Sequence, residues 1–151
     1  MLQGTVNVQL SPQALISCDY WFQYACDGGL LQPAWWWLEY NGLPSISCWP
    51  YQSSNGYVPD CRSTCMDGQP YKTYKAKWGT TSTYIGEQAI KEAIYKGGPV
   101  EAGFAVFDDF YSYTKGVYVR KSWNFVGFHA VKMVGTLFYR TVISTAWHCW
   151  D

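Results

Sequence analysis

Three stretches of the chain repeat apolar residues with the period of an amphipathic helix. The first is LSPQALISC, residues 10–18, in which Ser11 can cap the first turn. The second is LQPAWWWLEY, residues 31–40, and the Asn-Gly pair that follows it is a typical helix C-cap. The third lies in GEQAIKEAIYKGG, residues 86–98, and ends at its glycine pair. We therefore expect three helices, all of them before Pro99.

After Pro99 the pattern changes to the alternation of polar and apolar residues that indicates β-strands. Helices followed by an antiparallel sheet are typical of the α+β class. With 151 residues the chain is too short for two domains of ordinary size, so we expect one domain, with a helical and loop half at 1–97 and a strand half at 98–151. The predicted strands are VEAGFAVF at 100–107, GVYVRKSW at 116–123, FHAVKMVG at 128–135 and YRTVISTAW at 139–147.

Residues 45–80 show neither period, and their three cysteines and three prolines indicate a long loop that needs cross-links to be ordered. An even number of cysteines in a weakly charged chain favours disulfides in an oxidising compartment. The alternative is a zinc site at CRSTC, but no second close pair or nearby histidine completes it. The six cysteines are at positions 18, 26, 48, 61, 65 and 149.

The charge balance gives no sign of a nucleic-acid or membrane partner. Eleven basic side chains match eleven acidic ones, so the net charge is zero with both histidines neutral. A neutral surface offers no basic footprint for nucleic acid, and no apolar run approaches the ~20 residues that span a bilayer. The first ten residues lack the pattern of a secretory signal, so either the chain is not secreted or its biological start lies elsewhere.

Aromatic side chains make up 19% of the chain, and three tryptophans are consecutive at 35–37. Successive residues of a helix lie about 100° apart, so the three rings cannot all face one core and at least one is exposed. Tyr and Trp combine a large apolar area with a polar atom that needs a partner. A chain this aromatic and this weakly charged is therefore expected to have a partner surface.

Three groups of polar residues are candidates for chemistry. His129 lies in a strand that otherwise carries small and apolar residues, so it is either a hydrogen-bonded core histidine or a general base. Asp108 and Asp109 resemble a paired-carboxylate site, but FDDFYSY favours a solvated turn or a helix cap. His148 and Cys149 are adjacent on a predicted strand and so point to opposite faces, which prevents them from pairing directly.

Several of these strings occur together in one order along the chain. They are LSPQALISCD, CDGG before a helix, CWPY, CRSTC, YKGGPVEAGFAVFDDFYSYTKGVY and HAVKMVG. The series resembles the papain-like cysteine peptidases, and within them the cathepsin B-like branch. The resemblance covers about residues 10–135 and implies a partial papain-like fold, with a helical half, an antiparallel strand half and a disulfide-stapled loop between them.

The resemblance also implies roles for single residues. In this family a cysteine thiolate, paired with a histidine, attacks the peptide carbonyl. His129 matches that histidine, and Gly28 and Gly29 match the glycines whose backbone pairs with an extended peptide substrate. The family's disulfides correspond here to Cys18–Cys61 and Cys48–Cys65.

The chain departs from the family at several positions. The nucleophile lies in a QGxCGSCW-type segment upstream of the LSPQ helix, together with the oxyanion glutamine, and no such segment occurs among these residues. Cys26 matches the cysteine that bonds to that segment, so we expect it to be unpaired or bonded to Cys149, which is otherwise a free thiol. Thr145 stands where an asparagine orients the histidine, and Phe128 stands where the branch has glycine. The loop after CWPY contains no histidine, so the occluding loop of the branch is expected to be lost.

Three hypotheses follow from the resemblance. The chain is a degenerate relative, inactive alone, that serves as a structural or binding subunit; or it is the heavy chain of an active endopeptidase whose cysteine lies on a light chain or an N-terminal segment; or it is an incomplete gene product. The first two require a protein partner (a light chain, a second copy or a larger assembly) over the face left by the nucleophile helix. An extended peptide is the expected ligand, in a lysosome-like, vacuolar or secreted setting, without a metal or cofactor.

Overall fold

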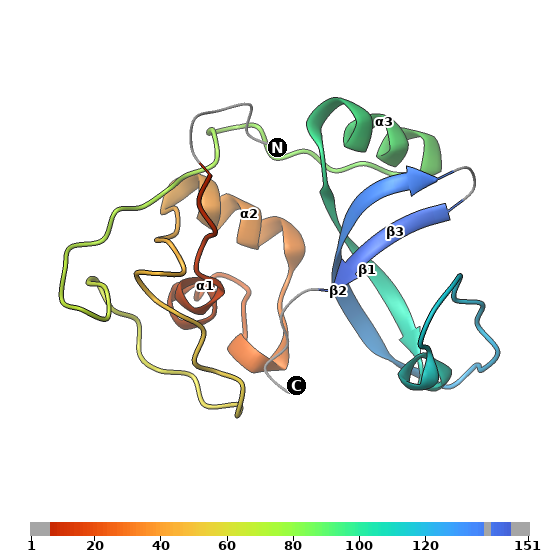
Figure 1. Cartoon of the computed structure of the whole chain (residues 1–151), viewed down its shortest axis with the longest axis horizontal. Coiled ribbons are helices and arrows are strands. Elements are labelled where there is room, and N and C mark those ends of the chain that lie inside the picture. The colour runs from red at the N-terminus through yellow and green to blue at the C-terminus, as the bar shows by residue number, and fades with distance from the viewer. Residues whose placement is uncertain (1–6, 138–139, 146–151) are drawn as a thin grey trace. The chain divides into compact units, whose positions relative to one another are not determined.

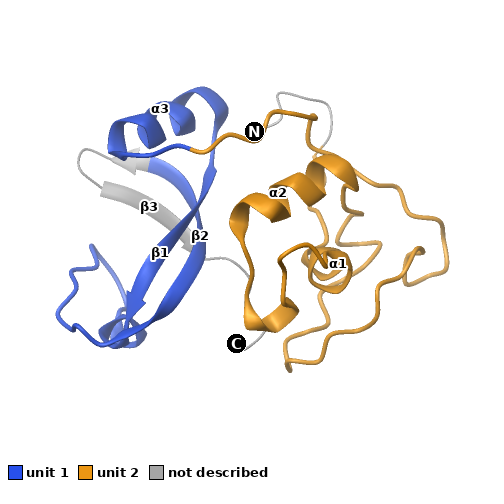
Figure 2. Cartoon of the chain, turned by 180° about the vertical axis from the view of Figure 1, so that it is seen from behind, with its two compact units in different colours: residues 1, 84–146 blue, residues 2–83, 147–151 orange. Residues whose placement is uncertain are grey.

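The computed structural model describes residues 7–137 and 140–145, with side chains through residue 135. The contacts divide this part of the chain into two compact units, 7–83 and 84–145, which are coloured separately in Figure 2. The third helix groups with the strands, because the boundary falls before it. The assignment of the whole chain to one incomplete domain stays a prediction. No helix within the described ranges is long and apolar enough to cross a membrane.

The unit of residues 7–83, orange in Figure 2, contains the helices α1 (Pro12–Cys18) and α2 (Leu31–Tyr40), both labelled in Figure 1. Ser11 caps α1, because its hydroxyl accepts a backbone N–H of the first turn at 3.1 Å. α2 ends at the predicted Asn-Gly pair, where the Asn41 N–H donates to the Trp37 carbonyl at 2.8 Å. Both predicted helices are therefore confirmed.

The core of this unit forms where α1 meets the loop that follows α2. Trp49 is fully buried and packs with Ala14, Cys18 and Leu43. Trp37 is partly buried against this cluster, whereas its two neighbours in the WWW run are exposed. The prediction that at least one ring of the run is exposed is confirmed, and the reason is the 100° step between helical residues.

A buried polar network fixes the loop on α1. Gln13 Nε2 donates to Ser53 Oγ at 2.8 Å, and Gln13 Oε1 accepts the Gln52 N–H at 2.7 Å. Ser11 Oγ donates to the Trp49 carbonyl at 2.6 Å. A buried polar group without a partner is costly, so these contacts determine where the loop lies on the helix.

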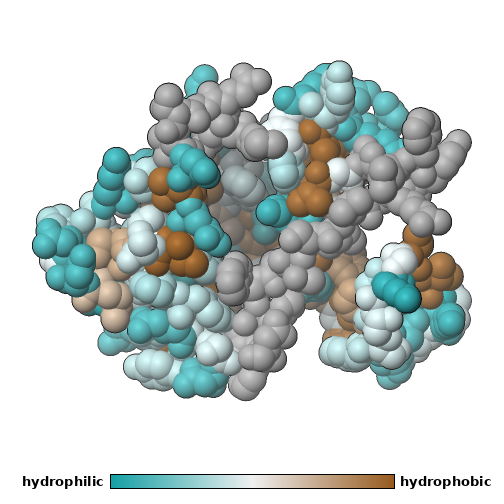
Figure 3. All heavy atoms as spheres, in the orientation of Figure 1, coloured by the Kyte–Doolittle hydropathy of each residue, from teal (hydrophilic) through white to brown (hydrophobic). Residues whose placement is uncertain are grey.

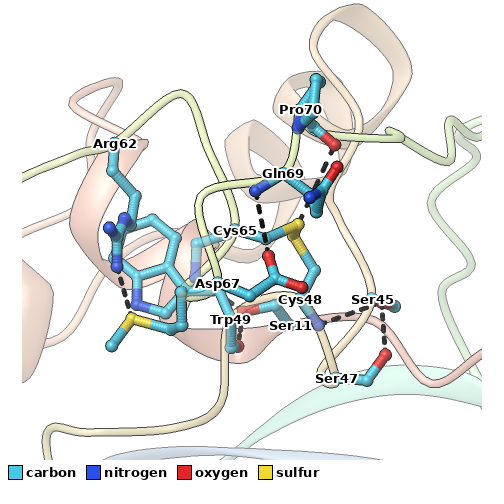
Figure 4. Close-up of a disulfide and its surroundings, with 12 residues drawn as sticks. Ser11, Ser45, Ser47, Cys48, Trp49, Arg62, Cys65, Asp67, Gln69 and Pro70 are labelled. Carbon is cyan, nitrogen blue, oxygen red and sulfur yellow. Dashed lines mark hydrogen bonds between the residues drawn. A yellow bond between two sulfur atoms is a disulfide. The ribbon is translucent and has the colours of Figure 1, made fainter.

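Two disulfides cross-link the long loop, in which residues 45–80 form turns and single antiparallel residue pairs but no helix or extended strand. Cys18 is bonded to Cys61, 43 residues away, and Cys48 is bonded to Cys65, 17 residues away. Figure 4 shows the second disulfide beside the buried Trp49. Both disulfides implied by the resemblance are thus present.

The unit of residues 84–145 contains α3 (Glu87–Gly97) and an antiparallel sheet of three strands in the order β1 (Val100–Phe107), β2 (Phe125–Leu137), β3 (Arg140–Thr145). A short 3₁₀ helix, η2 (Asp108–Ser112), follows β1. Figure 1 shows α3 near the start of β1 and η2 at the opposite end of the sheet. The α+β class and the antiparallel sheet agree with the sequence pattern.

The prediction of a strand at 116–123 is wrong, because this segment is an irregular loop between η2 and β2. The Asp109 carboxylate accepts the Lys121 N–H and the Tyr118 hydroxyl, both at 2.8 Å. A side chain that captures backbone donors in this way competes with a strand ladder. β2 also begins three residues earlier than the pattern predicts, at Phe125, with a register irregularity opposite the last residues of β1.

Candidate functional site

His129 lies in the central strand β2, opposite Phe104 of β1. The two rings meet edge to face, with centroids 5.7 Å apart and planes at 70°. The imidazole is half-buried. A histidine on a central strand is held in place by the sheet, and partial exposure leaves it reachable by a reactant, as a general base requires.

The neighbouring strand β3 contains the other predicted catalytic position, Thr145. Its backbone pairs Thr145 with Val131, two residues after His129, so position 145 lies two residue pairs along the sheet from the histidine. The Thr145 side chain lies outside the described part of the structure. Its role in place of the family's asparagine therefore stays a prediction.

Phe128, directly before His129, is 82% exposed. Successive residues of a strand point to opposite faces, so its ring lies on the face away from the imidazole. There its centroid is 5.3 Å from that of Phe125, which in turn lies 5.9 Å from Phe107. The residue that replaces the branch's glycine thus extends an aromatic row on the opposite face of the sheet.

The glycine pair lies in the loop between η1 (Ala25–Asp27) and α2. Gly28 has φ +103° and ψ −161°, a conformation that is essentially restricted to glycine. A Cβ on Gly29 would overlap Gln23 Oε1, and Gln23 is itself held because its Nε2 donates to the Leu30 carbonyl at 2.7 Å. Among the described residues the Gly29 N–H and C=O make no hydrogen bond, so an extended peptide could pair with both.

The same loop contains two non-glycine residues with a left-handed backbone, Phe22 at φ +59° and Ala25 at φ +53°. This conformation costs an L-residue roughly 1–2 kcal/mol. The hydrophobic pattern of the sequence does not predict a left-handed backbone at either residue. Ala25 directly precedes Cys26 in ACDGG, residues 25–29. The corresponding string of the cathepsin B-like branch is GCNGG, with glycine at position 25, and this difference could have revealed the left-handed backbone of Ala25.

Every cysteine that the structure describes is in a disulfide, Cys26 included. The predicted alternatives for Cys149 and its neighbour His148 lie outside the described residues. Cys61 and Cys65 bond to different cysteines, which rules out a zinc site at that pair. Within the ranges described, no three His, Cys, Asp or Glu side chains gather as metal ligands would. A disulfide sulfur is not a thiolate, so none of the five cysteines can attack a carbonyl.

Asp108 and Asp109 form the start of η2, as a solvated turn, and serve to hold the following loop. Hydrogen bonds from Ser122 and then Asn124 lower the pKa of Asp108. The backbone N–H of Lys121 is the main cause of the lowered pKa of Asp109. Both carboxylates are therefore ionised and accept hydrogen bonds from the loop that follows η2. A general acid–base pair needs one carboxyl group that holds a proton, so these two residues are unsuitable for that role.

The predicted site residues fall in both units. His129 and position 145 belong to the unit with the sheet, where the strand register determines their relation. Gly28 and Gly29 belong to the unit with α1 and α2, where the disulfide-linked loop determines their conformation. Gln23 was not predicted from the sequence, because its contact with Gly29 depends on how the loop turns back on itself.

Comparisons with known proteins agree with the resemblance in the sequence. Residues 1–142 match the family model of the papain family cysteine proteases. The chain is 36% identical over 147 residues to cathepsin B of Dictyostelium discoideum, covering 89% of this chain and 47% of that protein. It is 39% identical over 133 residues to cathepsin B-like CP3 of Giardia intestinalis, covering 85% of this chain and 43% of that protein. The chain thus spans less than half the length of these curated relatives.

Solved structures show the same fold. ProCathepsin B S9 from Trypanosoma congolense matches with a TM-score of 0.76 at 30% identity, over 91% of this chain and 48% of that one. The cysteine protease CMS1MS2 of Carica candamarcensis, solved in complex with E-64, matches with a TM-score of 0.62 at 22% identity, over 84% of this chain and 56% of that one, which shows the fold alone. The helices, sheet and disulfides therefore form a partial papain-like fold.

Proposed function

This chain belongs to the papain family of cysteine proteases, in its cathepsin B-like branch, and we propose that it acts as a structural or binding subunit that does not cleave peptide bonds by itself. The observation that carries the proposal is the state of its cysteines. All five that the structure describes are in disulfides. Peptide-bond hydrolysis of this type needs a thiolate within hydrogen-bond reach of the histidine, and none of the described cysteines offers one to His129.

Binding of an extended peptide is supported by the backbone around Gly29. Its N–H and C=O groups have no hydrogen-bond partner among the described residues, and it has no side chain to block an approaching strand. Pairing of backbone groups gives affinity for an extended peptide with little dependence on its sequence. We therefore infer that the ligand is an extended peptide segment, either a substrate-like peptide or a strand of a partner protein.

A protein partner is supported by exposed aromatic residues in the unit that contains the sheet. Trp123 is 81% exposed and Phe128 82%, although large aromatic side chains are usually buried. On the face shown in Figure 3 strongly apolar residues form small separate patches, so one continuous apolar surface does not carry this argument. The disulfides support an oxidising compartment, such as a lysosome-like, vacuolar or secreted one.

The second candidate is the heavy chain of an active cysteine peptidase, and the geometry of His129 favours it. The sheet holds this histidine opposite an aromatic ring and next to strand β3, which contains the position of the orienting residue. A histidine that acts as a base has to be held in one orientation by a neighbouring group. In this case a cysteine on another polypeptide or segment would form the thiolate–imidazolium pair.

Measurements on the protein purified from its native source distinguish the two candidates. Its intact mass is measured with and without reduction, followed by labelling with a thiol-directed probe and by assay with a fluorogenic peptide. The proposal expects no labelled cysteine and no hydrolysis above that of a His129→Gln variant. A second polypeptide that is released on reduction, takes the label and depends on His129 for hydrolysis would contradict the proposal and establish the heavy-chain candidate.

A further inference from the structure

The contact between His129 and Phe104 continues into a larger group of rings. Phe110 lies edge to face with Phe104, with centroids 5.2 Å apart. Tyr118 lies edge to face with Phe110 at 5.0 Å, and Tyr113 stacks on Phe110 at 5.5 Å with planes at 12°. We call Phe104, Phe110, Tyr113 and Tyr118 the aromatic relay. It runs from the histidine on β2, through β1 and η2, to the loop before β2.

The far end of the relay is fixed by hydrogen bonds. The Tyr118 hydroxyl donates to Asp109 Oδ1 at 2.8 Å, and Asp109 Oδ2 accepts the Lys121 N–H at 2.8 Å. The Tyr113 hydroxyl donates to the Gly116 carbonyl at 2.8 Å. The rings of Phe110, Tyr113 and Tyr118 are therefore packed between the sheet and an anchored loop. Phe104 contacts both Phe110 and the His129 imidazole.

The relay is separate from the aromatic row on the other face of the sheet. Phe107 is three residues after Phe104 on β1, so the pleat directs it to the opposite face, where it contacts Phe125. Glu101 and Lys132, the charged pair of the β1–β2 register, are each three residues from Phe104 and His129 and also occupy opposite-face positions. Phe104 is thus the side chain of β1 that shares a face and a register position with His129.

We propose that Phe104 is a positioning residue for His129, with the aromatic relay as its support. An edge-to-face ring contact restricts rotation of the imidazole about its side-chain bonds, because each ring orientation other than the packed one loses that contact. A histidine used as a base has to be held in one orientation for its partner, a role that the family's asparagine fills through a hydrogen bond. Phe104 constrains the ring from the side of β1. Its meaning for catalysis or binding rests on the proposed function, but the constraint itself does not.

The test is the NMR signal of the His129 imidazole in the full chain. The chain has only two histidines, so a His129→Gln variant assigns the signal. Phe104→Leu should move the imidazole proton shifts toward those of histidine in a short peptide, because the neighbouring ring current is gone, and should increase ring mobility. Phe104→Tyr should restore the wild-type signal. Tyr118→Phe, which removes the anchor to Asp109, should cause a smaller change in the same direction.

Phe107→Leu is the matched control, since it removes a phenylalanine of the same strand from the opposite face. It should leave the His129 signal in place. If Phe104→Leu keeps the fold and leaves the His129 shifts and mobility unchanged, or if Phe107→Leu changes them equally, Phe104 does not position the histidine. Neither result depends on a nucleophile. The inference about Phe104 can therefore fail while the proposed function holds. Conversely, a complex that hydrolyses peptides would overturn the proposed function and would leave the NMR result for Phe104 unchanged.

Discussion

Glu39 Oε1 accepts hydrogen bonds from both the backbone N–H and the hydroxyl of Thr81, at 2.7 and 2.6 Å, across 42 residues of sequence. The same carboxylate also accepts the N–H groups of Thr80 at 3.0 Å and Gly79 at 3.2 Å. Glu39 is only 6% exposed, near the end of α2. One buried carboxylate thus holds three successive backbone donors and fixes the end of the long loop on the helix.

Replacement of this carboxylate by an amide should loosen the loop. The Thr81 hydroxyl is the main cause of the lowered pKa of Glu39; burial acts against it, and the backbone N–H groups of residues 79–81 lower the pKa further. Its stabilising contribution is present above the ordinary glutamate pKa and is lost as the pH falls through the lower folded value. Glu39→Gln should therefore be less stable than the wild type at neutral pH, and the difference in the free energy of unfolding should shrink in acid.

Urea unfolding at a series of pH values measures this difference, and amide hydrogen exchange at Thr80 and Thr81 locates it. Glu87→Gln, at the exposed start of α3, is the control and should change stability little. A Glu39→Gln variant with wild-type stability and wild-type exchange at all pH values would show that the carboxylate does not hold the loop.

Asp19 should show the opposite dependence on pH. Its side chain is 2% exposed, Oδ1 accepts the Trp21 N–H at 2.8 Å, and the buried Oδ2 has no hydrogen-bond partner within the part of the chain that the structure describes. Burial is the main cause of its raised pKa. The folded state therefore binds a proton more readily than the unfolded state, so stability is gained as the pH falls from the raised value toward the ordinary one.

Asp19→Asn should remove this gain and raise stability at pH values above the raised pKa, where the wild type carries a buried charge. Thermal unfolding across the acid range measures the effect. The exposed Asp60→Asn is the control and should leave the pH profile unchanged. The interpretation is wrong if the profiles of Asp19→Asn and the wild type are parallel.

Ala25→Gly should stabilise the chain. Ala25 has φ +53°, and glycine adopts this conformation without the steric cost of a Cβ. The expected gain in the free energy of unfolding is about 1 kcal/mol, the left-handed penalty less the extra entropy of glycine in the unfolded chain. Ala34→Gly, inside α2, is the matched control and should lose about 1 kcal/mol. Equal losses in both variants would argue against strain at Ala25.

The two described disulfides should contribute unequally. Cys18–Cys61 spans 43 residues and Cys48–Cys65 spans 17. From loop closure in the unfolded chain, removal by paired alanine substitutions should cost about 4 kcal/mol for the longer loop and about 3 kcal/mol for the shorter one. Denaturant unfolding of each double variant tests this order. A larger loss for the shorter loop would show that native packing at Cys48–Cys65, rather than chain entropy, dominates.

Gly29→Ala should weaken the binding of an extended peptide. An added Cβ displaces Gln23 from its bond to the Leu30 carbonyl and obstructs the backbone groups of residue 29. We expect a loss of at least about tenfold in affinity, or about 1.4 kcal/mol, in a fluorescence anisotropy titration. Gly97→Ala, where a Cβ meets no atom within 4 Å, is the control and should bind like the wild type. Equal affinities of all three chains would remove Gly29 from the binding site.

The apolar pattern predicted the three helices and the strands β1, β2 and β3, because helical and strand periods are local properties of the sequence. It failed at 116–123, where the residues alternate as in a strand but the Asp109 carboxylate, outside the segment, accepts the Lys121 N–H and the Tyr118 hydroxyl. The pairing of the cysteines followed from motif resemblance and not from spacing.

The sequence by itself determined the family, the helices, most strands and the identity of His129, Gly28 and Gly29 as site candidates, since motifs and periods are readable without coordinates. Only the tertiary structure decided that Phe104 faces His129 and that Glu39 holds the long loop. These contacts join residues 25 and about 40 positions apart. Which polar or aromatic group meets which partner over such distances depends on how the strands register and the loop closes, and no local pattern specifies that.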